Sequence, residues 1–227
     1  MTEKMKITWL GHSCFKAESQ NYTVIFDPYE DGYVPGLNLA PQEADLVLCS
    51  HDHADHNART MVNIRQGKAS PFRIQTISTY HDNRQGALRG KNTIHILDDG
   101  TFRIAHAGDL GCELLPNQKE LLKNLDLLML PIGGYYTIDA NQAKQLAEDI
   151  KPKVTVPMHY RGPAFGFDVL STLNDYTDLC DDVVYYNGNT LELTKDTLKQ
   201  TAVFRRLRGS VSETCKRRGN YNPKKGG

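Results

Sequence analysis

The sequence predicts an α/β fold in which sheets and helices form a layered sandwich, and three observations support this prediction. Short β-type runs alternate with helical stretches along most of the chain. No linker and no internal repeat interrupts residues 5–194, which favours a single domain. The chain has 227 residues, of which 39% are hydrophobic, so it can bury a core. We expect one domain over residues 1–200 and a C-terminal tail over residues 201–227.

Strands are expected wherever a short apolar or alternating run lies between turn residues. The first three cover residues 6–10, 14–17 and 23–26, and they are separated by a Gly-His-Ser turn and by a polar segment. Residues 46–49 form a continuous apolar run, which is typical of a strand buried on both faces. Further strands are expected over residues 73–77, 93–97, 102–106, 127–130, 154–156, 183–186 and 190–193.

The clearest helix is expected over residues 140–150. Its apolar side chains follow helical spacing, at Ala140, Ala143, Ala147 and Ile150. Asp139 and Gln142 are placed like a capping box, in which each side chain binds the backbone of the other residue. Helices of this kind would pack outside the strands and complete the sandwich.

Composition excludes several classes of protein. Charged residues make up 24% of the chain, which is ordinary for a globular protein and unlike a disordered or fibrous one. The most apolar stretch, residues 125–134, is about half as long as a bilayer span requires, so no transmembrane segment is expected. The N-terminus lacks the apolar run of a secretory signal. Five widely spaced cysteines predict no disulfide framework, and we expect a cytoplasmic location.

The net charge of zero hides an asymmetry between the body and the tail. Residues 195–227 contain ten Lys and Arg against two acidic residues, whereas the preceding residues carry a compensating negative charge. The segment from Arg205 onward is polar, Gly-rich and basic, and we expect a flexible, solvated terminus there. Only this tail has a charge that would favour contact with nucleic acid or anionic lipid, because the body is acidic.

The strongest chemical signal is the segment SHDHADH at residues 50–56, directly after an expected strand. Three of the chain's eight histidines lie within six residues of one another. Imidazole nitrogens and carboxylate oxygens are ligands that zinc takes in proteins. Alternation along the chain would turn His51 and His53 the same way, and Asp55 and His56 could then face a second ion.

Two ions need more ligands than one loop supplies, and three residues at later strand ends fit this need. His81 follows the strand that ends in Ser-Thr-Tyr, and His159 follows the run Val-Thr-Val-Pro-Met. Asp109 follows a strand and Gly108, and a glycine allows the backbone to bring a carboxylate close to its target. The sequence therefore predicts a His and Asp cluster that combines several strand ends.

These residues resemble those of the metallo-β-lactamase-fold hydrolases, and among them the ascorbate-6-phosphate lactonase and the N-acylphosphatidylethanolamine phospholipase. The likeness is carried, in this order, by WLGHSCF, IFDPY, SHDHADHN, YHD with LRGKNTI, HAGDLG, LPIGGYYTIDA and VPMHYR. It implies a four-layer αββα sandwich. His56 is followed by Asn57-Ala58 where glyoxalase II has two glycines, and no secretory signal precedes the domain, so neither glyoxalase II nor secreted β-lactamase activity is expected.

The resemblance also implies a site for two divalent metal ions. His51, His53 and His81 would hold one ion, Asp55, His56 and His159 would hold the other, and Asp109 would bridge both. Zinc is the first choice of metal, and Mn²⁺ or Fe²⁺ is compatible with the same ligand types. A hydroxide held between the ions would be the nucleophile, and Asp55 could orient it or carry its proton.

Four further residues could support such a site. His12, in the Gly-His-Ser turn, could face the ions or be a hydrogen-bonded structural group. Arg89 could bind an anionic group of the substrate or be an ordinary surface charge. Asp82 could orient the ring of His81, and His106 is expected in the core or behind a ligand.

Three functions follow from these features. The first is a dinuclear metal-dependent hydrolase that cleaves an ester, lactone, amide or phosphodiester bond of a small substrate, which could be anionic. The second is a nucleic-acid phosphodiesterase of the same fold, assisted by the basic tail. The third is a noncatalytic metal-binding protein, against which an open metal position would argue. The substrate pocket is expected in loops such as residues 31–39 and 161–167, and the sequence leaves the substrate and the oligomeric state open.

Overall fold

The computed structural model describes residues 3–205 of the chain. The predicted basic tail lies almost entirely beyond Arg205 and therefore outside the described residues. Among the described residues, no helix is both long enough and apolar enough to span a membrane.

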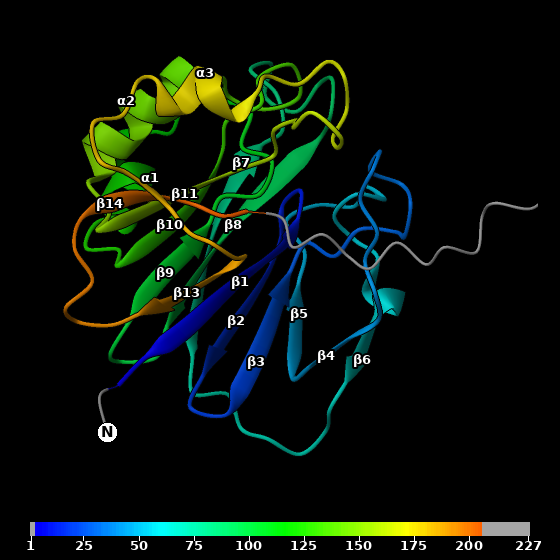
Figure 1. The fold of residues 1–227 in the computed structure, drawn as a ribbon, viewed down its shortest axis with the longest axis vertical. Coiled ribbons are helices and arrows are strands. Elements are labelled where there is room, and N and C mark those ends of the chain that lie inside the picture. Colours follow the sequence, from blue (N-terminus) through cyan, green and yellow to red (C-terminus); the bar gives the residue numbers. More distant parts are fainter. Residues whose placement is uncertain (1–2, 206–227) are drawn as a thin grey trace, which may run out of the picture.

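A five-stranded sheet forms the first half of the molecule. Its order is β13 (Thr190–Leu193), β1 (Met5–Gly11), β2 (Cys14–Ser19), β3 (Tyr22–Phe26) and β5 (Leu46–Leu48). Strands β1 to β3 pair antiparallel through short turns, and β5 then joins β3 in parallel. The small sheet of β4 (Gln42–Ala44) and β6 (Val62–Ile64) lies beyond β5, as Figure 1 shows.

A seven-stranded sheet forms the second half. Its order is β12 (Val183–Tyr185), β14 (Gln200–Val203), β11 (Val154–Met158), β10 (Leu127–Pro131), β9 (Arg103–His106), β8 (Lys91–Asp98) and β7 (Arg73–Tyr80). Strands β12, β14, β11, β10 and β9 all run parallel to one another. Strand β8 pairs antiparallel with both β7 and β9. Parallel neighbours bring several carboxyl ends to one edge of the sheet.

The helices α1 (Pro116–Leu121), α2 (Ala140–Ile150) and α3 (Leu173–Thr177) lie on the side of the seven-stranded sheet that faces away from β1 to β3 (Figure 1). The bounds of α2 agree with the predicted helix. Its N-terminus has the expected capping box, in which Asp139 accepts a hydrogen bond from the backbone N–H of Gln142 at 2.9 Å. A short 3₁₀-helix, η1 (Arg59–Met61), precedes β6.

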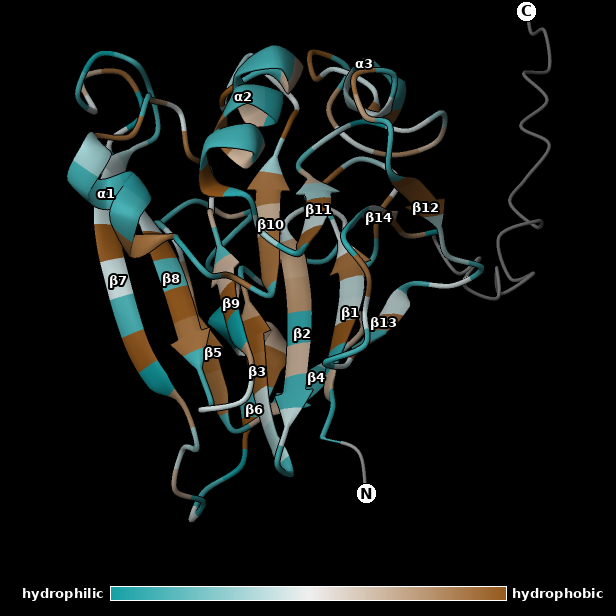
Figure 2. Ribbon diagram, turned by 90° about the vertical axis from the view of Figure 1, so that its left-hand side faces the viewer, coloured by the Kyte–Doolittle hydropathy of each residue, from teal (hydrophilic) through white to brown (hydrophobic). Residues whose placement is uncertain are grey.

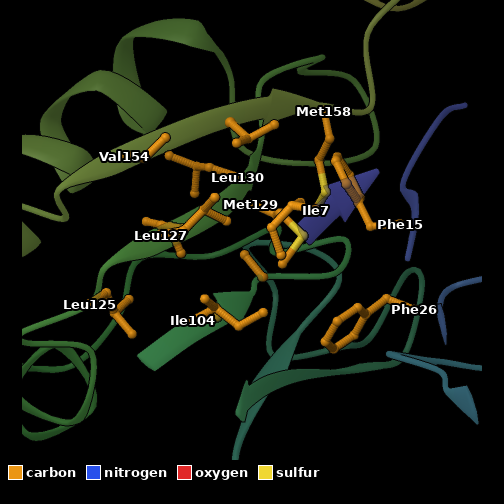
Figure 3. Packing of buried hydrophobic residues seen from close by; sticks show 14 of the residues in the cluster. Ile7, Phe15, Phe26, Ile104, Leu125, Leu127, Met129, Leu130, Val154 and Met158 are labelled. Carbon is orange, nitrogen blue, oxygen red and sulfur yellow. The ribbon is translucent and has the colours of Figure 1, made fainter. Parts of the chain in front are cut away.

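The main core lies between the two sheets and extends under α2. Figure 3 shows Ile7, Phe15 and Phe26 of the first sheet packed near Met129 and Ile104 of the second. Figure 2 shows β10 in hydrophobic colours along most of its length, which agrees with the burial of all five of its residues. Strand β7, at the edge of this sheet, alternates between hydrophobic and hydrophilic bands (Figure 2).

A second buried cluster covers the opposite face of the five-stranded sheet. Alternation along the strands sends Cys14, Ile25 and Val47 to that face, where they meet Tyr29, Val34, Leu37 and Leu39 of the following loop. This outer layer consists of loop, η1 and the small β4–β6 sheet within the described residues. The two sheets with their outer layers make a layered sandwich of the kind that the resemblance implies.

The structure contains every predicted strand and adds elements that the sequence did not indicate. The additions are β4, β6, β14, α1, α3 and the 3₁₀-helix η1. One prediction is wrong, because residues 46–49 are not a strand buried on both faces. Strand β5 is at the edge of its sheet, and Leu46 and Leu48 are only partly buried. Strand β14 begins at Gln200, so the sheet includes residues on both sides of the predicted boundary.

Candidate metal centre

The predicted ligands lie at one end of the two sheets, where loops from both sheets meet. The turn between β1 and β2 supplies His12, and the loop after β5 supplies residues 51–56. His81, Asp109 and His159 follow β7, β9 and β11. Residues far apart in the sequence therefore come together because their strands end at the same edge.

Two groups of ligand atoms form within this cluster. Nitrogen atoms of His51, His53 and His81 all lie within 4.8 Å of one another. The second group has the same spacing and consists of Asp55, His56 and His159 together with His12. A third set, His51 with His56 and Asp109, connects the first two. The grouping matches the division into two ligand sets that the resemblance implied, with His12 added.

The carboxylate of Asp109 lies between the two groups. Its Oδ2 atom is 3.0 Å from Nε2 of His159, 3.2 Å from Nε2 of His56 and 3.3 Å from Nε2 of His81. Burial raises the pKa of Asp109, but His159 and His56 outweigh burial and hold that pKa well below its usual range. An ionised, buried oxygen thus faces imidazoles of both groups.

Several polar atoms of the cluster are buried without a hydrogen-bond partner. They include Nε2 of His51, Nε2 of His56 and Oδ1 of Asp109. Unpaired buried polar atoms are costly, and here they converge on one another instead of on donors. Burial lowers the pKa of His51 to about 3, which keeps its imidazole neutral and its lone pair available. Neutral imidazoles beside ionised carboxylates are a donor set that fits divalent cations.

Asp27 positions His56 from behind, and sequence reasoning did not assign it a role. Its carboxylate accepts hydrogen bonds from Nδ1 of His56 at 2.8 Å and from the backbone N–H and Oγ of Ser50 at 2.6 Å each. Burial raises the pKa of Asp27, but His106 and His56 lower it to about 2. The only signal in the sequence was an Asp-Pro pair at the end of an apolar strand.

Hydrogen bonds to Nδ1 orient other imidazoles as well. Nδ1 of His81 lies 3.0 Å from the backbone carbonyl of Tyr136, and Nδ1 of His51 lies 2.9 Å from Oγ of Ser50. When Nδ1 carries the proton, Nε2 has the free lone pair that a cation needs. The backbone N–H of Asp109 donates to Oδ1 of Asn92 at 2.9 Å, which fixes the start of that loop.

His12 is a member of the cluster, and His106 lies behind it. The ring of His12 is buried, 4.2 Å from the ring of His159, and its Nε2 is 3.4 Å from Oδ2 of Asp55. Burial lowers the pKa of His12 to about 4, so its ring is neutral. His106 is buried and stacks on Phe26 with Nε2 2.8 Å from the carbonyl of Ser13, which agrees with the predicted core position.

Asp82 does not orient His81, contrary to the alternative raised from the sequence. Its carboxylate accepts four backbone hydrogen bonds, from the N–H groups of Arg84, Gly86, Leu88 and Arg89. Burial raises the pKa of Asp82, but these four donors outweigh it and lower the pKa to about 2. The residue instead fixes the loop that follows the ligand position.

A cavity of about 440 Å³ opens onto the cluster. His53, Asp55, His81 and Asp109 of the cluster line it together with Arg89 and Tyr136. Tyr33 and Phe167 complete the lining from the two loops in which the sequence placed a pocket. A volume of this size suits a small molecule.

The fold agrees with comparisons to known proteins. Residues 6–159 match the family model described as the beta-lactamase superfamily domain. A UPF0173 metal-dependent hydrolase from Carboxydothermus hydrogenoformans is 29% identical over 204 residues, which cover 73% of this chain and 89% of the relative. A UPF0173 protein from Pyrococcus furiosus is 28% identical over 181 residues, which cover 69% of this chain and 83% of the relative.

A solved structure gives the same result. It is a proposed Zn-dependent hydrolase of the metallo-β-lactamase superfamily from Thermotoga maritima, 31% identical to this chain. The match covers 89% of this chain and all of that one, with a TM-score of 0.70. The chain belongs to the metallo-β-lactamase superfamily of metal-dependent hydrolases.

Proposed function

We propose that the protein is a dinuclear metal-dependent hydrolase of a small-molecule substrate. The observation that carries this proposal is the position of Asp109, whose Oδ2 is within 3.3 Å of Nε2 of His81 from one group and of His56 and His159 from the other. A carboxylate shared in this way could bind two cations at once. A single-ion site would need only one of the two groups.

Each proposed set of metal ligands corresponds to one of the two groups of ligand atoms. His51, His53 and His81 would hold one ion, Asp55, His56 and His159 the other, and Asp109 both. Zinc fits these nitrogen and carboxylate donors best, and Mn²⁺ or Fe²⁺ is compatible with them. Bound ions would supply Lewis acidity and would lower the pKa of a water molecule toward neutrality.

Asp55 is proposed to orient the attacking water. Burial raises its pKa, but His56 and His12 lower that pKa well below its usual range, so the carboxylate is ionised at neutral pH. Its side chain is 15% exposed and lines the cavity, unlike the fully buried Asp27. An ionised oxygen at the cavity wall can accept a hydrogen bond from a water molecule and so fix its orientation.

Three side chains near the cluster that could act as nucleophiles, Cys49, Cys112 and Ser50, are unsuited to replace water. Burial raises the pKa of the Cys49 thiol to about 12, and burial also raises the pKa of Cys112. The hydroxyl of Ser50 is buried and donates to Asp27. A water molecule is therefore the proposed nucleophile, and the reaction would be hydrolysis of an ester, lactone, amide or phosphodiester bond.

The cysteines, the family resemblance and the cavity volume support proposals about the location of the protein and about its substrate. The four cysteines among the described residues are free, which supports a reducing cytoplasmic location. The resemblance to the ascorbate-6-phosphate lactonase and the N-acylphosphatidylethanolamine phospholipase supports lactones and phosphodiesters as the first substrates to test. The cavity volume of about 440 Å³ favours a small molecule over a nucleic acid.

Metal content and turnover measured on one sample test the proposal. The purified full chain is analysed for bound metals and assayed against lactones, esters, amides and phosphodiesters, before and after treatment with a chelator. We expect close to two ions per chain and activity that disappears with chelation and returns with zinc. One ion or fewer after reconstitution would contradict the dinuclear site. Two ions without turnover of any substrate would favour the noncatalytic alternative.

A further inference from the structure

Arg89 is a cation at the cavity that forms no ion pair with any described residue. Its guanidinium carbon lies 5.3 Å from the ring centre of Tyr136 and 5.7 Å from that of Tyr135. Stacking against two rings removes part of its hydration but leaves its N–H groups unsatisfied by protein carboxylates. A partly buried guanidinium without a partner can bind an oxyanion of a ligand.

The loop that carries Arg89 is fixed beside the ligand cluster. Asp82 accepts the backbone N–H of Arg89 at 2.8 Å, together with three other N–H groups of the same loop. The carbonyl of Gly90 accepts the N–H of His81 at 3.1 Å, and the N–H of Gly90 donates to Gly86. The backbone of Arg89 is therefore held at a defined distance from His81. A preorganised cation loses less entropy when it binds an anion.

Aromatic side chains continue from Arg89 along the cavity. We define the aromatic wall as Tyr136, Phe167 and Tyr33. The rings of Tyr136 and Phe167 have centres 6.2 Å apart, and those of Phe167 and Tyr33 are also 6.2 Å apart. Tyr33 is 49% exposed, so part of the wall is open to a ligand. Such a surface favours an apolar or planar body over a fully polar one.

Other charged side chains that line the cavity restrict where an anion can bind. Asp52, Asp55 and Asp109 line the cavity together with the imidazoles. Carboxylates repel a second anion unless a cation is between them. Arg89 is the only Arg or Lys among the residues that line this cavity, so the anion of a ligand that avoids the carboxylates has a single protein partner.

We propose that the substrate carries a carboxylate or phosphate group that binds Arg89, and an apolar or aromatic body that lies against the aromatic wall. This inference deepens the proposed hydrolase function and rests on it for the position of the scissile bond. The planar guanidinium presents two parallel N–H donors, which match two oxygen atoms of a carboxylate or phosphate. Arg89 then determines specificity, while the His and Asp cluster determines the reaction.

Paired esters test the role of Arg89 in the metal-loaded full chain. One phenyl ester carries a terminal carboxylate, the second carries a terminal phosphate, and the third is neutral with the same scissile bond. We expect the wild-type protein to prefer the anionic esters. Replacement R89A should reduce kcat/KM for the anionic esters by about 10- to 100-fold, mainly through KM, and the neutral ester should lose much less.

Two further variants separate charge from geometry. R89K keeps the charge but loses the planar fork and the stacking, so we expect an intermediate preference. R84A removes an exposed arginine from the same loop and is the matched control, with the preference of the wild-type protein. Equal losses on all three esters, or an unchanged preference in R89A, would show that Arg89 only covers Tyr135 and Tyr136 and would overturn the inference.

Binding measurements keep the inference testable if no ester is hydrolysed. Phenylacetate, phenyl phosphate and acetate are titrated calorimetrically into the wild-type protein, R89A and F167A. R89A should weaken the binding of both phenylacetate and phenyl phosphate, and the larger loss of affinity identifies the preferred anion. F167A should weaken phenylacetate more than acetate, because only the former contacts the wall. Weakened binding without turnover would support Arg89 as an anion site and contradict the hydrolase, whereas equal binding to wild-type and R89A would overturn the inference.

Discussion

The carboxylate of Asp27 and the imidazole of His56 form a buried hydrogen bond of 2.8 Å from Nδ1 to Oδ2, and neither side chain is exposed to solvent. This contact sets the direction of Nε2, the atom that faces Asp109. Replacement D27N removes the charge that favours the proton on Nδ1 of His56. We expect the affinity for zinc to fall about 10- to 100-fold while the fold is retained.

Competition with a chelator of known affinity measures the effect of D27N. D45N is a matched control, because Asp45 is also a buried carboxylate near the same sheet but pairs with Arg65 at 2.7 Å. The control should lower stability and leave zinc affinity as in the wild-type protein. Equal zinc affinity in D27N and the wild-type protein would show that Asp27 does not position a ligand.

Asp109 is expected to determine how many ions the protein retains. Replacement D109N keeps the shape of the side chain but removes the charge between the two groups, so we expect fewer than two ions per chain. Activity should fall by about two orders of magnitude or more, as expected when a group that stabilises the reacting charge is lost. Elemental analysis, turnover and circular dichroism on the same sample measure these effects. Near-native turnover in D109N would contradict a shared ligand.

Binding of zinc should release protons at neutral pH, mainly from His56. Burial lowers the pKa of His56, but Asp109 and Asp55 outweigh burial and hold the pKa well above its usual value in the metal-free site. His56 therefore holds a proton more strongly than an ordinary imidazole and must release it to bind a cation, whereas His51, with a pKa of about 3, is already neutral. Zinc titrations in two buffers of different ionisation enthalpy measure the release.

The same competition predicts the pH dependence of activity. Protons and metal compete for the imidazoles of the site, above all for His56, whose pKa is raised, so activity should fall as the pH drops below neutrality. Excess zinc should restore part of it. Zinc binding without any dependence on the buffer, combined with activity that persists at pH 4.5 in a chelator, would contradict the ligand assignment.

Asp82 should stabilise the fold at neutral pH more than in acid. Its pKa is about 2 in the folded protein, below the ordinary value of 3.8. A carboxylate with a lowered pKa contributes stability above its ordinary pKa and loses that contribution as the pH falls toward the folded value. The difference in urea midpoint between the wild-type protein and D82N should therefore shrink between pH 5 and pH 3. Chelator-treated samples exclude metal effects, and D196N, at an exposed position, is the control.

Truncations distinguish the sheet from the tail. Removal of residues 206–227 should leave the melting temperature and small-molecule turnover within experimental error of the full chain. Removal from residue 200 onward deletes β14, which pairs with both β11 and β12, and should prevent folding. Gel-shift measurements on the full chain and on the protein that lacks residues 206–227 test the nucleic-acid alternative. Loss of turnover on a nucleic acid, together with loss of binding, would favour a phosphodiesterase over the small-molecule hydrolase.

Local signals explain which elements could be predicted from the sequence. The helix from Ala140 to Ile150 was predicted with its correct bounds because its cap and its spacing are both encoded within a few residues. Strand β14 was missed because Gln200 and Thr201 are polar, and their burial results from the neighbouring strands. Strand β5 was assigned to the wrong environment because an apolar run does not indicate whether it lies at a sheet edge.

The site shows the same division between local and long-range information. The motif at residues 50–56 could be found directly, because its donors are neighbours in the chain. The position of Asp109 between His56 and His159 depends on which strand ends meet, and only the topology determines that. Asp27 was missed for a related reason. Its partners follow a different strand, and its backbone has a φ of +43°, a left-handed conformation that the sequence Asp-Pro does not specify.

The two ligand groups each draw residues from both sheets. His51 and His53 follow a strand of the five-stranded sheet and His81 a strand of the seven-stranded sheet, and His56 and His159 are divided in the same way. An ion in either group would therefore act as a cross-link that closes a loop of the chain. Cross-links restrict the entropy of the unfolded chain, and more so for longer loops. The ion held by His56 and His159 closes the longer loop, so its loss would weaken the cohesion of the sandwich more than loss of the other ion.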